Sequence, residues 1–192
     1  MALTERVPRE EISAAFLNTI RLLGDPNQPQ PRLSATMPVF VLGLHNLASG
    51  RVTQGARQSG WQCFAVGPDG VTSGEVGDWA PGNPPPAASR SRGPAVDRAL
   101  AAYEALKKLD IDLVRNVNVD YEPLALRIPG LHIEALWLRK KPFSDQIDQD
   151  YVVPFHTFDR NLAAKLIFSM REFLEIARPL AKKQLAIVPP RD

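Results

Sequence analysis

The chain has 192 residues, 44% of them hydrophobic, and its 23 basic and 21 acidic side chains leave a net charge of +2. A chain of this size buries roughly 70% of the surface that its unfolded form exposes, so the composition favours one globular domain. The small net charge argues against nucleic acid as a partner. The single cysteine, Cys63, excludes an internal disulfide framework and a multi-cysteine metal site.

The N-terminal segment, residues 1–24, has the pattern of an amphipathic helix. Ile12, Phe16 and Ile20 recur at helical spacing and predict a helix over residues 8–23. Such a helix could complete the core of the domain or insert into a groove on another chain.

A proline-rich connector, a strand and a hairpin are expected next. Residues 25–38 contain four prolines among polar residues, and an extended connector of this kind lets the first helix pack at a distance. Residues 39–47 are mostly apolar and predict a strand. Residues 61–66 and 71–76 predict a hairpin, because the proline and glycines of residues 67–70 suit a tight turn.

A second proline-rich stretch, residues 77–94, separates this hairpin from the next helix. Its composition indicates a solvated loop; alternatively, its polyproline segment could dock on a partner with an aromatic-lined groove. An apolar stripe at helical spacing predicts a helix over residues 95–109. Residues 113–120 alternate between two sets of side chains and predict a half-exposed strand.

Residues 131–138 form the most informative stretch, because they are almost continuously apolar and too few for a typical helix. This pattern predicts a strand buried on both faces, at the centre of the sheet. It could pair with residues 123–128 in a second hairpin. Residues 151–155 predict an edge strand, and residues 160–177 a final helix that Pro179 ends or kinks.

We therefore expect an α+β fold with an antiparallel or mixed sheet of about five to seven strands and two or three helices packed mainly on one face. The helices at 95–109 and 160–177 would form that layer, within a core domain of residues 39–178, and residues 179–192 would form a mobile tail. The N-terminus lacks the order of a signal peptide and no segment has about 20 consecutive apolar residues, so we expect a cytoplasmic protein without a membrane partner.

His132, Glu134 and Cys63 are the candidate catalytic residues. On a strand, His132 and Glu134 share one face, where they could act as a base with its orienting carboxylate, or as two metal ligands. A pair satisfied by the backbone or by a basic side chain is the alternative. Cys63 lies within a predicted strand, which favours a small buried hydrophobic residue, although a dyad with His132 or His156 stays open.

No nucleotide-binding, phosphate-binding or nucleophile-elbow motif occurs in the sequence. The leading hypothesis is a non-enzymatic protein–protein interaction or assembly subunit that binds a partner protein or a second copy of itself, with no cofactor and no metal. The alternative is a small hydrolase or transferase that uses His132 and Glu134, with or without Cys63. A nucleic-acid adaptor would require distant basic residues to converge, namely Arg90, Arg92, Arg139, Lys140, Lys141, Lys182 and Lys183.

Overall fold

The computed structural model describes residues 2–3, 6–8, 10–24, 27, 29–77, 89–109, 120–145, 147–162 and 167–187. The strands are β1 (Ala2–Leu3), β2 (Arg32–Leu42), β3 (Ala56–Gly67), β4 (Gly70–Gly77), β5 (Asp120–Ile128), β6 (Ile133–Lys140), β7 (Tyr151–His156) and β8 (Phe168–Ser169). The helices are α1 (Glu10–Leu23), α2 (Leu44–Ser49), α3 (Val52–Gly55), α4 (Pro94–Leu109) and α5 (Met170–Ile187), and a 3₁₀ turn, η1 (Pro129–Leu131), precedes β6.

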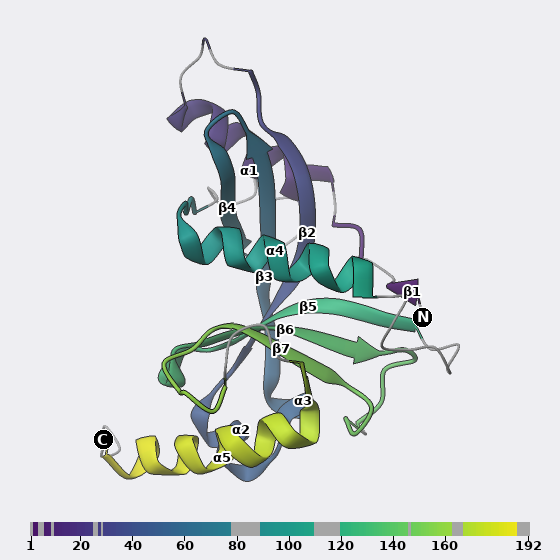
Figure 1. Cartoon of the computed structure of the whole chain (residues 1–192), viewed down its shortest axis with the longest axis vertical. Coiled ribbons are helices and arrows are strands. Elements are labelled where there is room, and N and C mark those ends of the chain that lie inside the picture. Colours follow the sequence, from purple (N-terminus) through teal and green to yellow (C-terminus); the bar gives the residue numbers. More distant parts are fainter. Residues whose placement is uncertain are drawn as a thin grey trace.

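The strands form one mixed sheet, which confirms the predicted α+β fold. Seven strands follow the order β4-β3-β2-β5-β6-β7-β8, and β1 pairs with β5 outside this path. The pairs β2–β5 and β1–β5 are parallel and the others are antiparallel. The strands β2–β4 run along the long axis of the molecule, whereas β5–β7 cross it (Figure 1), and β2 and β5 pair over only three residues where the two directions meet.

Helices cover both faces of this sheet. On the first face, Ala99 and Tyr103 of α4 pack against Met37, Leu136 and Val153. On the second face, α2 and α5 pack against β5, β6 and the start of β7, and α1 packs against β3 and β4. The sequence prediction that the helix at 95–109 shares a layer with the C-terminal helix is therefore wrong. Both faces of the central strands are apolar, so each face needs its own cover.

The N-terminal helix is part of the core. Its predicted span is confirmed within two residues, and Phe16 is completely buried among Trp61, Cys63 and Val76. Figure 1 shows α1 alongside β2–β4, at the opposite end of the molecule from α5. The expected connector over 25–38 is shorter than predicted, because β2 already begins at Arg32.

The strand β2 differs from the predicted strand 39–47 at both ends. Pro38 lies inside the strand, at a point where β3 pairs on one side and β5 pairs only from Val39 onward. Within the described residues, its missing N–H therefore interrupts no ladder with β5. At the other end, the expected strand over 39–47 stops at Leu42 and the chain turns into the short helix α2.

The C-terminal helix begins and ends later than its pattern predicted. Residues 160–162 form a turn, and α5 starts at Met170 because Ser169 and Glu172 form a capping box. The Glu172 carboxylate accepts hydrogen bonds from the backbone N–H and the hydroxyl of Ser169, both at 2.7 Å, and these bonds lower the pKa of Glu172. The helix then continues through Pro179 to Ile187, so most of the expected mobile tail is helical.

Both predicted hairpins are confirmed. β3 and β4 pair in register around residues 67–70, and β5 and β6 pair from Ile128–Ile133 to Tyr121–Lys140. Of the expected strand over 113–120, all but the last residue lies outside the described residues, as do residues 78–88 of the second proline-rich stretch. None of the described helices has the length and apolar character needed to cross a membrane.

Replacing Phe173 by alanine should strongly destabilise the fold. Phe173 is completely buried between α5 and the second face of the sheet, so the change leaves a cavity and costs about 3–5 kcal/mol of unfolding free energy. Urea denaturation measures the change. Glu175→Ala, on the exposed side of the same helix, is the control and should change the free energy by less than about 0.5 kcal/mol. Similar losses in both variants would contradict this packing.

Candidate functional site

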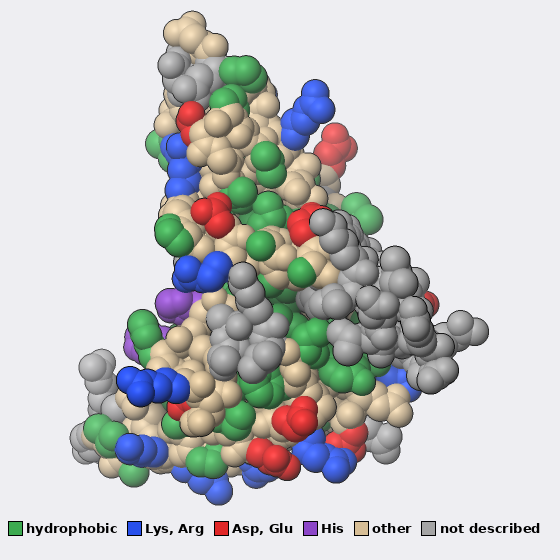
Figure 2. Space-filling view, viewed as in Figure 1, with side chains coloured by type: hydrophobic (Ala, Val, Ile, Leu, Met, Phe, Trp, Pro, Cys, Tyr) green, Lys and Arg blue, Asp and Glu red, His purple; other side chains and the backbone are tan. Residues whose placement is uncertain are grey.

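A cavity of about 260 Å³ opens on the first face of the sheet, next to the start of α4. We call it the waist pocket, because it lies where β2–β4 meet β5–β7. Figure 2 shows histidine and basic side chains together in this region. The polar residues that line it and carry the argument are Gln62, Glu75, Ser91, Arg127, Glu134 and His156.

Arg127 is the centre of a polar network in the waist pocket. Its guanidinium forms an ion pair with Glu75, donates a hydrogen bond of 2.7 Å to the side chain of Gln62, and lies 3.8 Å from Glu134. Glu75 also accepts a hydrogen bond from the hydroxyl of Ser59 at 3.3 Å. Two carboxylates thus face one guanidinium, and this network carries an excess of negative charge.

The register of three strands places Arg127, Glu134 and His156 in one row. Arg127 pairs with Glu134 across β5 and β6, and Glu134 pairs with His156 across β6 and β7. The register between β6 and β7 shifts by one residue at Phe155, which is a β-bulge. Without this bulge the residue opposite Glu134 would be Phe155, so the bulge brings the imidazole to the pocket.

An exposed aromatic side chain stands at the rim of the pocket. Phe158 follows β7 and is 74% exposed. Its ring packs edge-to-face against the imidazoles of His132 and His156, with ring centroids 5.5 and 5.3 Å apart. Phe158 thus keeps most of its ring exposed while its position is fixed by two neighbouring imidazoles.

The structure separates two of the three candidate catalytic residues from the pocket. His132 is not on β6: it caps the turn η1 with a left-handed backbone (φ 52°), and its N–H donates to the carbonyl of Pro129 at 3.1 Å. The prediction that His132 and Glu134 share a strand face is therefore wrong, because the turn extends through His132. Glu134 itself does line the pocket.

Cys63 lies on the second face of the sheet, in the apolar layer beneath α1. It is completely buried, and burial raises the pKa of its thiol to about 12. His156 and Glu134 line the pocket on the first face, so the sheet separates them from the sulfur. The structure matches the alternative from the sequence, a small buried hydrophobic residue.

Sequence reasoning missed Arg127, Glu75 and Gln62 as site residues. One signal was present, since Arg127 is a charged residue inside the apolar run 124–128, where a buried strand residue needs a polar partner. The partners from β3 and β4 could not be identified, because they are more than 50 residues away in the sequence.

No protein-family model matches the sequence, and no curated protein or solved structure matches it significantly. Among the described residues, no group of three or more histidine, cysteine, aspartate or glutamate side chains is arranged to hold a metal ion. The geometry of the waist pocket is therefore the basis for any functional proposal.

Replacing Arg127 by glutamine should destabilise the fold by about 1–2 kcal/mol, because Glu75 and Glu134 would face each other without a counter-charge. The loss should shrink at high salt and should be partly recovered by adding Glu75→Gln. Arg171→Gln is the control, since its ion pair with Asp148 is exposed and contributes little. Urea denaturation at low and high salt measures both; an Arg127 variant as stable as the control would disprove this role.

Alkaline pH should destabilise the native chain through Cys63. The folded thiol keeps its proton up to about pH 12, whereas an unfolded cysteine loses it near pH 8.5–9. Between these values the unfolded state binds fewer protons, so the free energy of unfolding falls as pH rises. Relative to Cys63→Ala, the native chain should lose about 1.5 kcal/mol between roughly pH 8 and pH 10. A difference that stays constant over this range would show that the thiol is not sealed.

Proposed function

We propose that the chain is a non-enzymatic protein–protein interaction or assembly subunit, and that its waist pocket binds a positively charged side chain of the partner. The observation that carries this proposal is the charge of the pocket. Glu75 and Glu134 face a single guanidinium, Arg127, so an added ammonium or guanidinium group would balance the second carboxylate.

Glu134 is the carboxylate available to a ligand. It is 41% exposed, and its distance of 3.8 Å from Arg127 is longer than a hydrogen bond. Arg127, in contrast, already engages Glu75 and Gln62. An anionic ligand would have to break these bonds, whereas a cationic ligand could use the oxygens of Glu134, which accept no hydrogen bond from the described residues.

The size of the pocket and its rim support a side chain as the ligand. A cavity of about 260 Å³ is below the usual range for drug-sized ligands and cofactors, which is about 300–1,000 Å³, but it can hold one long side chain. The exposed ring of Phe158 then offers apolar and cation–π contact to the rest of the partner.

The three residues expected for the enzymatic alternative, Cys63, His132 and Glu134, do not lie together in one site. A hydrolase or transferase of the expected kind needs its nucleophile, base and orienting carboxylate within hydrogen-bond reach. Cys63 lies on the opposite face of the sheet from Glu134, and His132 lies in the turn before β6. These positions favour binding over catalysis.

Blocked arginine (the Nα-acetyl amide) should bind the waist pocket, and Glu134→Gln should weaken this binding roughly tenfold, because it removes the charge of the exposed carboxylate. Nuclear magnetic resonance titration measures the affinity, and the amide signals of Glu75, Arg127 and Glu134 should shift. Blocked citrulline has the same shape without the charge, and it should bind about tenfold more weakly than arginine.

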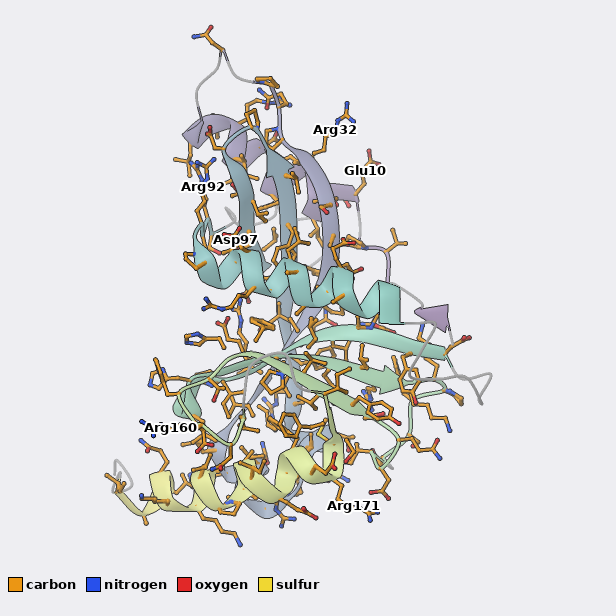
Figure 3. All side chains as sticks on the ribbon, viewed as in Figure 1. Glu10, Arg32, Arg92, Asp97, Arg160 and Arg171 are labelled. Carbon is orange, nitrogen blue, oxygen red and sulfur yellow. The ribbon has the colours of Figure 1, made fainter. Side chains whose placement is uncertain are left out.

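Glu10→Gln is the matched control for this titration. Glu10 lies in the first turn of α1, and Figure 3 shows it on the other side of the molecule from Arg92 and Asp97. The substitution removes the same charge as Glu134→Gln and should leave the affinity unchanged. Equal affinities for arginine and citrulline, or an equal effect of the two glutamine substitutions, would show that the pocket does not select a cation.

A further inference from the structure

The outer edge of β4 is covered by a short segment of the chain itself. We call residues 89–92 the strap. Ser91 and Ser73 exchange two backbone hydrogen bonds, of 2.7 and 2.9 Å, and the N–H of Ser89 donates to the carbonyl of Glu75 at 3.0 Å. The hydroxyl of Ser89 accepts a further bond from the N–H of Glu75 at 2.9 Å. The strap therefore pairs with β4 as an antiparallel strand would.

Two features hold the strap in this place. Arg90 donates a hydrogen bond of 2.9 Å to the carbonyl of Leu23 at the end of α1, and Arg92 donates one of 3.0 Å to the hydroxyl of Thr72. Opposite the strap, β4 has Gly74, and a Cβ atom there would collide with the carbonyl oxygen of Ser89. The glycine thus permits a close approach of a second backbone to this edge.

The strap also forms one wall of the waist pocket. Ser91 is paired with Ser73, and directly paired residues of antiparallel strands project to the same face. Both serines line the pocket, next to Glu75 and Gln62. Serine is short, so the strap leaves the cavity unfilled, whereas a long side chain at the same position would extend toward the carboxylates.

We propose that an extended segment of the partner protein replaces the strap on β4, and that a lysine or arginine of that segment takes the position of Ser91 and enters the waist pocket. This inference rests on the proposed function and names the way in which the partner binds. Strand addition supplies backbone hydrogen bonds, and the pocket supplies the specificity.

The strap is suited to replacement. Ser89, Ser91 and Arg92 are exposed, and the strap is held by three backbone hydrogen bonds to β4 and by the side-chain bonds of Ser89, Arg90 and Arg92. An incoming strand would form the same backbone bonds, and its basic side chain would add an ion pair that serine cannot form. The partner is therefore a polypeptide with a basic residue in an extended segment.

A disulfide can lock the strap and test this proposal. Residues that exchange two hydrogen bonds in an antiparallel pair have Cα atoms about 5.5 Å apart, within the range of about 4.4–6.8 Å that disulfides need. We therefore choose the double variant Ser73→Cys/Ser91→Cys, whose reduced form is its own control. The native Cys63 is buried and does not compete for the new thiols.

The probe is a fluorescent peptide with the sequence of residues 89–96 carrying Ser91→Lys, and the control peptide carries Ser91→Gln. Fluorescence anisotropy should show that the reduced protein binds the lysine peptide roughly tenfold more tightly than the glutamine peptide. Oxidation should weaken binding of the lysine peptide at least about tenfold, because the strap can no longer leave. Equal binding before and after oxidation would overturn strand addition.

Blocked arginine separates failure of this inference from failure of the proposed function. If the oxidised and reduced proteins both bind blocked arginine while oxidation leaves peptide binding unchanged, the pocket is cation-selective and strand addition is wrong. If neither form binds it, the proposed function itself is wrong.

The full-length variant Ser91→Lys provides a second test that needs no disulfide. Its own strap should fill the pocket and reduce binding of the lysine peptide about tenfold, with an unchanged circular dichroism spectrum. Peptide binding equal to that of the native chain would refute the inference.

Discussion

Burial of β6 on both faces is the constraint on which the rest of the structure depends. Its side chains alternate between the layer under α4 and the layer under α5, and Trp137 is its largest buried residue. Asp150 holds this arrangement: its carboxylate accepts hydrogen bonds from the indole N–H of Trp137 at 2.8 Å and from the backbone N–H of Lys140 at 2.9 Å, and its carbonyl accepts one from Met170. Burial raises the pKa of this carboxyl, while the hydrogen bonds from Lys140 and Trp137 act in the opposite direction.

The waist pocket lies where the apolar layer under α4 ends. α4 covers the first face over Leu136 and Leu138. Next to the first turns of α4, the residues of β5 and β6 that face this side, Arg127 and Glu134, are polar. There the cross-strand row of Arg127, Glu134 and His156 meets Gln62 and Glu75, since the Arg127 side chain reaches both of these residues. The polar groups are half-buried and pair with one another, so the site is compatible with a stable fold without being sealed.

Local patterns made the fold class and most elements predictable. The spacing of Ile12, Phe16 and Ile20 identified α1, and the glycine-flanked turn at 67–70 identified the first hairpin. The predicted start of the last helix at residue 160 coincides with a turn, in which the Asp159 carboxylate accepts a hydrogen bond of 2.8 Å from the backbone N–H of Asn161, but the capping box of Ser169 and Glu172 starts α5 itself. Of the three candidate catalytic residues, only Glu134 lines the pocket; the bulge at Phe155 and the pairing of Arg127 with Glu75 depend on tertiary contacts that the sequence does not reveal.

The two ends of the sheet path show why the strap is more than edge protection. At the far end, β7 pairs with β8 over only two residues, and Pro154 follows in β7. A short edge strand and a proline are features that limit strand addition. At the β4 edge, a segment with ordinary backbone donors and acceptors is held over a glycine, and two serines face a cavity with excess negative charge. Protection alone does not require such a cavity, whereas selective replacement by a strand with a basic residue does.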